Sequence, residues 1–292
     1  MYIIPDTRDL IELLERNKPV GVEQFREVLN TNGHSIVLSY SNVAEFVRPL
    51  LSDNDFLRMR AKLNDLESLP LVYIRESTLA HAELALAVDA FKGGDEPTRL
   101  NPYVSRWDEV ITPFGNTATK IFLNFRLHEI VSTAWKQNAL HLNMQPFSLM
   151  LVDKMARERA LPARRTRNLF DAFLPWVLKT LQDPRIATTL SPGEANLFAR
   201  AVYENPFWCP GMRLAFEIYH AVRVNSNDPV QDGDILDIAH LTTLPYVDAL
   251  TADARMIDYA KRALRKLSAI DRRFDFQSRL FPNLRRLIGS LA

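Results

Sequence analysis

The sequence is poor in the residues that mark several classes of protein. Its 292 residues include one cysteine, Cys209, which excludes an intramolecular disulfide framework and a thiolate-rich zinc site. Glycine is scarce at nine residues, and no run approaches the roughly 18 apolar residues that cross a bilayer. The opening MYIIPDTRDLIELLERNK lacks the basic region and cleavage site of an export signal. We therefore expect a cytoplasmic location and no membrane partner.

The residues that are abundant indicate a soluble, helix-rich globular protein. Hydrophobic residues make up 47% of the chain and charged residues 24%, which argues against extensive disorder. The net charge is only +1, but from residue 254 to the end ten basic residues face three aspartates. A second basic run covers residues 154–167. Such runs are usually solvated helix faces, and a neighbouring acidic nuclease site would favour phosphate binding instead.

Short apolar runs alternate with amphipathic segments at both ends of the chain. Residues 2–5, 35–40 and 69–75 each have the composition of a strand, and each precedes a helical pattern. We expect Ser77 to cap the third helix, which then ends at Gly93–Gly94. The alternation returns near residue 234, with a helix, a turn at Pro245, a strand that ends before Asp253 and another helix. This order predicts an α/β fold with a parallel sheet.

The middle of the chain has a different texture. Long apolar-periodic stretches with few strand-like runs occupy residues 95–227, so we interpret this segment as an all-helical insertion. The α/β domain is then made of residues 1–94 and residues 228–292, and the second part carries the basic C-terminal helices. Trp135 and Trp176 in the insertion are interpreted as packing residues.

Carboxylates recur where the predicted strands end. Asp6 and Asp253 directly follow strands, and Glu45 lies about one turn into the helix after the second strand. Asp234 and Asp237 are three residues apart, on one helix face. Because loops at the carboxyl ends of parallel strands form the ligand crevice, these side chains are expected to converge. Converging carboxylates repel one another unless a cation compensates, and an oxygen-rich pocket suits Mg²⁺ or Mn²⁺.

The same residues resemble the motifs of the PIN-domain ribonuclease family. The matching segments are IIPDT with Asp6, SNVAEF with Glu45, GDILDIAHL with Asp234, and ALTAD with Thr251 and Asp253. The resemblance covers roughly residues 1–92 and 228–265. It implies that Asp6, Glu45, Asp234 and Asp253 bind the metal, directly or through water, and that Thr7 fixes the first carboxylate. Asp237 competes with Asp234 for the third position, and Arg8 stands where the family commonly has Asn or Ser.

The resemblance implies an endoribonuclease in which Mg²⁺ or Mn²⁺ activates water, with RNA as the preferred nucleic acid. The family includes VapC-type toxins, which leaves an antitoxin-like protein and a second copy of the chain open as partners. One alternative is an inactive PIN-like module that binds nucleic acid or protein. Another is a phosphatase of the haloacid-dehalogenase type, which expects Asp-x-Asp near residue 6, whereas the chain has DTR.

Three further polar residues near the motifs receive their own interpretation. Asp248 is interpreted as structural, in contact with a backbone or basic group, and His240 as a structural histidine. Arg255 either binds a substrate phosphate or tethers a carboxylate, and the sequence leaves both roles open.

Overall fold

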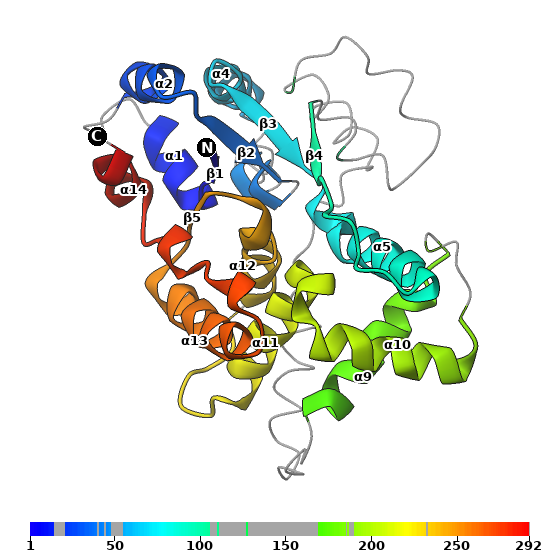
Figure 1. Ribbon diagram of the computed structural model, residues 1–292. Coiled ribbons are helices and arrows are strands. Elements are labelled where there is room, and N and C mark those ends of the chain that lie inside the picture. The colour runs from blue at the N-terminus through cyan, green and yellow to red at the C-terminus, as the bar shows by residue number, and fades with distance from the viewer. Residues whose placement is uncertain are drawn as a thin grey trace.

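The computed structural model shows a central sheet between helical layers, with a helical lobe to one side (Figure 1). The description is confined to well-placed parts of the chain, which are residues 1–14, 21–39, 41–43, 45–47, 55–105, 110, 127, 169–184, 186, 190–231 and 233–291. Within them, no helix is both long and apolar enough to cross a membrane.

The sheet has six strands in the order β4-β3-β2-β1-β5-β6. The strands are β1 (Tyr2–Ile4), β2 (Ser35–Leu38), β3 (Leu71–Ile74), β4 (Tyr103–Val104), β5 (Ala249–Thr251) and β6 (Leu280–Phe281). All neighbours pair in parallel except β3 and β4, which are antiparallel. The predicted α/β class with a parallel sheet is therefore confirmed.

Alternate residues of each strand face opposite layers, as the two-residue period of a strand requires. Ile3, Ile36 and Ala249 enter a core formed with the helices of one face. These helices are α1 (Thr7–Leu14), α2 (Val22–Thr31), α4 (Phe56–Glu67) and α14 (Leu284–Leu291). Two of them, α2 and α4, are additions to the strand and helix order that the sequence predicts.

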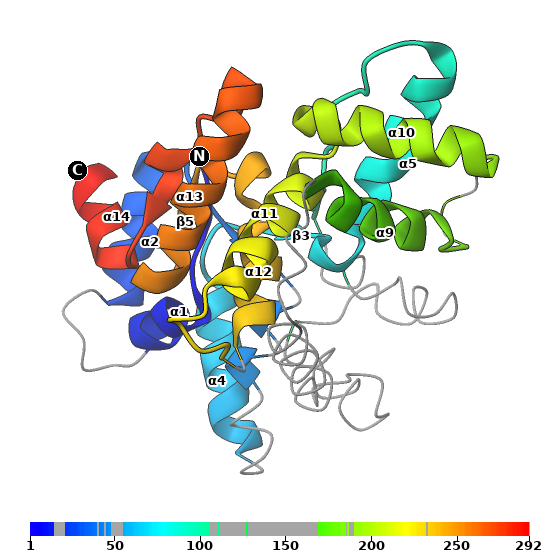
Figure 2. The ribbon, with the colours of Figure 1, turned by 90° about the horizontal axis from the view of Figure 1, so that it is seen from below.

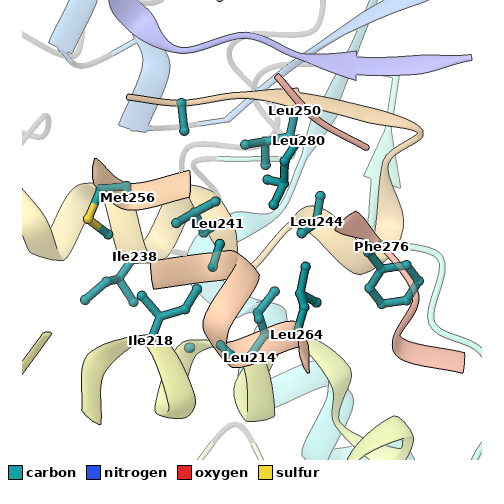
Figure 3. Close-up of a cluster of buried hydrophobic side chains, with 14 of the residues drawn as sticks. Leu214, Ile218, Ile238, Leu241, Leu244, Leu250, Met256, Leu264, Phe276 and Leu280 are labelled. Atoms are coloured by element: carbon teal, nitrogen blue, oxygen red, sulfur yellow. The ribbon is translucent and has the colours of Figure 1, made fainter. Parts of the chain in front are cut away.

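Ile4, Val37 and Leu250 enter the core on the opposite face of the sheet. This face is covered by α11 (Pro210–Val224), α12 (Asp234–Leu241) and α13 (Ala254–Ile270). In Figure 3, Leu214 and Leu241 of two different helices point into this shared cluster. Both faces of the parallel sheet are therefore buried, as is usual for this architecture.

A helical lobe lies beside the sheet and is seen apart from α1, α2 and α14 in Figures 1 and 2. It is formed by α5 (Leu79–Gly93), α9 (Leu169–Leu181) and α10 (Pro192–Glu204), with part of α11. The predicted packing role of Trp176 is confirmed, since its ring lies 5.1 Å from that of Tyr219 and 5.6 Å from that of Phe216. Trp135 and the basic run at residues 154–167 lie outside the described residues.

The prediction that residues 95–227 are entirely helical is wrong. This segment contributes β4 to the edge of the sheet, and α11 packs directly onto the face of the sheet. Two-residue strands have too little pattern to be recognised in sequence. A helix such as α11 shows which face is apolar, but its periodicity does not say which partner covers that face.

The helix after β3 starts one residue later than expected, and the proposed cap is wrong. A short 3₁₀ turn, η1 (Glu76–Thr78), precedes α5, and Thr78 occupies the N-cap position without a side-chain hydrogen bond. The predicted end is confirmed, because Gly94 has a φ of 75°, a left-handed conformation that glycine adopts without strain.

Candidate functional site

The topology of the sheet places the candidate site between β1 and β5. The chain proceeds from β1 to β2 and β3 on one side, and later returns to β5 and β6 on the other. In an open α/β sheet, such a reversal opens a crevice at the carboxyl ends of the two central strands. Asp6 follows β1 and Asp253 follows β5, so these two predicted site residues lie at the point where the strand order reverses.

Thr251 connects the ends of the two strands. Its hydroxyl accepts a hydrogen bond from the backbone N–H of Asp6 at 2.7 Å and donates one to the carboxylate of Asp9. Asp9 also accepts the backbone N–H of Leu284 at 3.2 Å, which anchors the start of α14. Burial raises the pKa of Asp9, and these two hydrogen bonds oppose the rise. The side chain of Thr251 thus helps to position Asp6 by bonding its backbone N–H.

Glu45 is oriented by polar residues that come from two strand ends. The Thr7 hydroxyl donates a 2.6 Å hydrogen bond to Glu45 Oε2, and Asn42 Nδ2 donates to the carbonyl of Pro5 at 3.1 Å. Burial raises the pKa of the Glu45 carboxyl, while the bond from Thr7 and the proximity of His240 lower it. Thr7 was expected to fix the carboxylate of Asp6, and this prediction needs correction. Its hydroxyl bonds Glu45 instead, and the Asp6 carboxylate is held by the backbone N–H of Arg8.

Asp6 and Asp253 are each held by a backbone N–H at the start of a helix. Asp6 Oδ1 accepts from Arg8 at 2.9 Å, and Asp253 Oδ1 accepts from Met256 at 2.8 Å as the N-cap of α13. N-cap aspartates commonly have this geometry. In both cases the contact occupies one carboxylate oxygen, and the second has no hydrogen bond to any residue that the structure describes.

Among the predicted site residues, Asp237 shows most clearly that the carboxylates lie near one another. Burial raises its pKa to about 8, and the negative charges of four other carboxylates add to the rise, in the order Asp253, Asp6, Glu45 and Asp234. These carboxylates lie just after β1, just after β5, on α12 and on the helical segment after β2, which are distant in sequence. The tertiary structure therefore brings the five predicted acidic residues within electrostatic range of one another.

Asp234 has a different environment from Asp237 although both belong to α12. Its side chain is fully buried and forms a two-point ion pair with the guanidinium of Arg255, with Nη2 to Oδ2 at 3.1 Å. Its Oδ2 also accepts the backbone N–H of Gln231 at 2.9 Å. The hydrogen bonds from Arg255 to Asp234 and to Asp228 hold the pKa of Arg255 above its usual range. Of the two roles left open for Arg255, the structure shows the second, because its side chain binds the carboxylate of Asp234.

The other two polar residues near the motifs have structural contacts. Asp248 Oδ2 accepts the backbone N–H of Tyr2 at 2.7 Å, which confirms its interpretation as a structural residue at the paired strands. His240 is buried, and its Nε2 lies 3.0 Å from the carbonyl oxygen of Thr251. The histidine thereby fixes the end of β5 next to the carboxylates.

The carboxylates are close but do not form a closed coordination shell. Among the residues that the structure describes, no three His, Cys, Asp or Glu side chains form a group that could hold a metal ion as they stand. The donor set nevertheless consists of oxygen ligands alone, which fits Mg²⁺ or Mn²⁺ rather than a softer metal. Mg²⁺ usually keeps several of its waters and contacts only one or two carboxylates directly.

Sequence reasoning missed two acidic residues at this edge. Asp9 lies three residues after Asp6, in the first turn of α1. Glu76 follows the end of β3 and is 8% exposed. Its Oε2 accepts the N–H of Ser41 at 3.3 Å, and its Oε1 is buried without a hydrogen-bond partner in the described part of the chain. The position of Glu76 after a strand is the signal that could have found it.

Comparison of the chain with protein-family models, with curated proteins and with solved structures found no match in any of the three. The functional argument therefore depends on the residues of the site.

Proposed function

We propose that the protein is a Mg²⁺- or Mn²⁺-dependent nuclease of the PIN type that hydrolyses phosphodiester bonds in RNA. The observation that supports this function most strongly is the environment of Asp237 at the reversal point of the sheet, where burial raises its pKa and the negative charges of four other carboxylates add to the rise. Such an arrangement is costly for a protein that has no use for it, because like charges in a partly buried site repel one another. A divalent cation compensates for this cost.

The proposed ligand set is Asp6, Glu45, Asp237 and Asp253. In Asp6, Glu45 and Asp253, one oxygen is held by a protein donor, and none of the described residues bonds the other, which would be the one to bind an ion or its waters. Asp237 replaces Asp234 in the set, because Asp234 is fully buried and occupied by Arg255 and Gln231. These side chains would hold the ion directly or through its bound waters.

The residues around this set position the reaction. When bound, Mg²⁺ or Mn²⁺ lowers the pKa of a coordinated water and neutralises charge on the phosphoryl group. Thr7 holds the side chain of Glu45 through its hydroxyl, and the hydroxyl of Thr251 holds the backbone N–H of Asp6. Arg255 keeps Asp234 neutralised, so that one fewer uncompensated charge opposes an incoming phosphate. No nucleophilic side chain is required.

The test is cleavage of labelled single-stranded RNA and DNA by the purified protein with Mn²⁺ or with EDTA. We expect cleavage of RNA that needs the cation and that falls by at least about 100-fold in Asp6→Asn and in Asp237→Asn, since each removes a ligand charge. Asp248→Asn is the matched control, because Asp248 bonds a backbone N–H outside the ligand set. Metal-dependent cleavage that survives both ligand substitutions would refute the assigned site.

The alternative function is a PIN-like module that binds nucleic acid or protein without hydrolysis. The absence of a closed group of metal ligands among the described residues favours it. Retained RNA binding, with no cleavage under any divalent cation, would support this alternative over the nuclease. A comparison of Asp234→Asn with Asp237→Asn separates the two functions further. The nuclease function predicts that the two variants differ in their rate of RNA cleavage, whereas the binding module predicts no such difference.

A further inference from the structure

A cavity of about 580 Å³ lies beside the carboxylates, between α1, the start of α13 and α14. Its volume falls within the roughly 300–1,000 Å³ of typical small-ligand pockets. Two of its lining residues border the proposed ligands directly. Arg8 donates its backbone N–H to Asp6, and Ala254 follows Asp253 in the chain. A molecule in the cavity would therefore lie next to the proposed reaction centre.

The lining combines an apolar wall with a charged rim. Leu13, Leu284 and Ile288 supply apolar surface from two helices, and Arg8 of α1 and Arg285 of α14 supply positive charge. Both arginines are exposed, and neither forms an ion pair with a residue in the described parts of the chain. The acidic members of the lining are Asp9 and Glu12. Asp9 is buried and occupied by Thr251 and Leu284, so its carboxylate faces its own donors.

We propose that this cavity binds the nucleotide next to the scissile phosphate of a single-stranded substrate. The base lies against the apolar wall, and Arg8 and Arg285 bind the phosphate groups on either side of it. This inference rests on the proposed function, because it takes the carboxylates as the reaction centre. Arginine suits the role since its planar guanidinium binds phosphate oxygens in pairs and stays charged.

The position of Arg8 gives this assignment its specificity. The residue stands two positions after Asp6, and its backbone N–H already bonds the Asp6 carboxylate. Its side chain is free to point away from the ligands and toward the cavity that it lines. Arg285 lines the same cavity from α14, whose start is bonded to α1 by the backbone N–H of Leu284 and the carboxylate of Asp9.

The experiment measures binding of a fluorescein-labelled single-stranded RNA decamer by anisotropy, in EDTA, to the full-length protein. Arg8→Ala and Arg285→Ala are each expected to raise the dissociation constant about 5- to 10-fold. Each should also reduce the slope of log Kd against log salt by about 0.7, the loss of one phosphate contact on a single strand. Arg286→Ala is the matched control, since it removes the same charge from the neighbouring position of α14 without lining the cavity. We expect less than a 2-fold change.

A second variant tests the apolar wall independently of charge. Ile288→Trp fills the cavity, and it should weaken binding while leaving the salt dependence of the remaining binding unchanged. Circular dichroism and thermal unfolding establish that each variant is folded. Equal weakening by Arg8→Ala, Arg285→Ala and Arg286→Ala would overturn the inference, because it would show a diffuse charge effect. Lack of RNA binding by the wild-type protein would overturn it as well.

Failure of the cavity assignment and failure of the nuclease assignment have different signatures. If the wild-type protein cleaves RNA with Mn²⁺ while Arg8→Ala and Arg285→Ala leave Kd and KM unchanged, the cavity assignment is wrong and the nuclease stands. If binding depends on both arginines but no cleavage occurs with any divalent cation, the nuclease is wrong and the cavity remains a nucleotide-binding site. A DNA decamer of the same sequence shows whether the 2′-hydroxyl contributes.

Discussion

The buried carboxyl of Glu83 gives a sharp prediction for the pH dependence of stability. Glu83 is 2% exposed in α5 and accepts the backbone N–H groups of Gly211 at 2.6 Å and Met212 at 2.9 Å, at the start of α11. The Tyr246 hydroxyl donates a further hydrogen bond to it. Burial outweighs these donors and raises the pKa of Glu83 to about 7 from its ordinary value of 4.5.

The raised pKa fixes both the sign and the size of the effect. The folded protein holds the Glu83 proton more tightly than the unfolded chain, so the associated stability is fully present below pH 4.5 and is lost as the pH rises to about 7. A shift of about 2.5 units corresponds to about 3 kcal/mol in the free energy of unfolding. Above about pH 7, this contribution is absent and the free energy of unfolding no longer changes with the titration of Glu83.

The assay compares urea unfolding of the wild-type protein and of Glu83→Gln at pH 5 and at pH 8. Other carboxyls with raised pKa values, such as Asp237, contribute equally to both proteins and cancel in the comparison. We expect the wild-type protein to lose roughly 2–3 kcal/mol more than the variant between the two pH values. A gap between the two proteins that is the same at both pH values would refute the raised pKa of Glu83.

Three further predictions concern packing, charge and metal. Gly211→Ala should lower the free energy of unfolding by about 1–3 kcal/mol, because an added Cβ would lie 2.8 Å from both Glu83 Oε1 and Thr242 O. Gly193→Ala, with open space around it in another helix, should be neutral or stabilising by up to about 1 kcal/mol in the same urea assay. Arg255→Ala should cost about 3 kcal/mol by leaving the buried Asp234 unpaired. Arg262→Ala, whose ion pair is half exposed, should cost less than about 1 kcal/mol, and equal costs would contradict this reasoning. Finally, Mn²⁺ at about 100 times its Kd should stabilise the wild-type protein by about 2.7 kcal/mol in thermal unfolding. Asp237→Asn should lose most of this stabilisation, and an unchanged shift would exclude Asp237 as a ligand.

The fold was predictable where the sequence pattern is local and repeated. The three N-terminal strands, the strand before Asp253 and the helix after it all occur where the apolar runs and caps place them. The short strands β4 and β6 were not predictable, because two residues carry no period. The role of α11 was missed for another reason. Its amphipathic pattern predicts a helix with an apolar face, but not that this face covers the sheet.

The sequence by itself determined the candidate residues of the site, because strand ends and helix starts are local features. It placed Asp6 and Asp253 after strands that proved to be adjacent, although about 250 residues separate them. Only the tertiary structure decided the roles within that set. Asp234 and Asp237 are equivalent in sequence, yet Arg255 pairs with one and leaves the other among the remaining carboxylates. Burial and partner choice depend on distant segments, so no local pattern of residues encodes them.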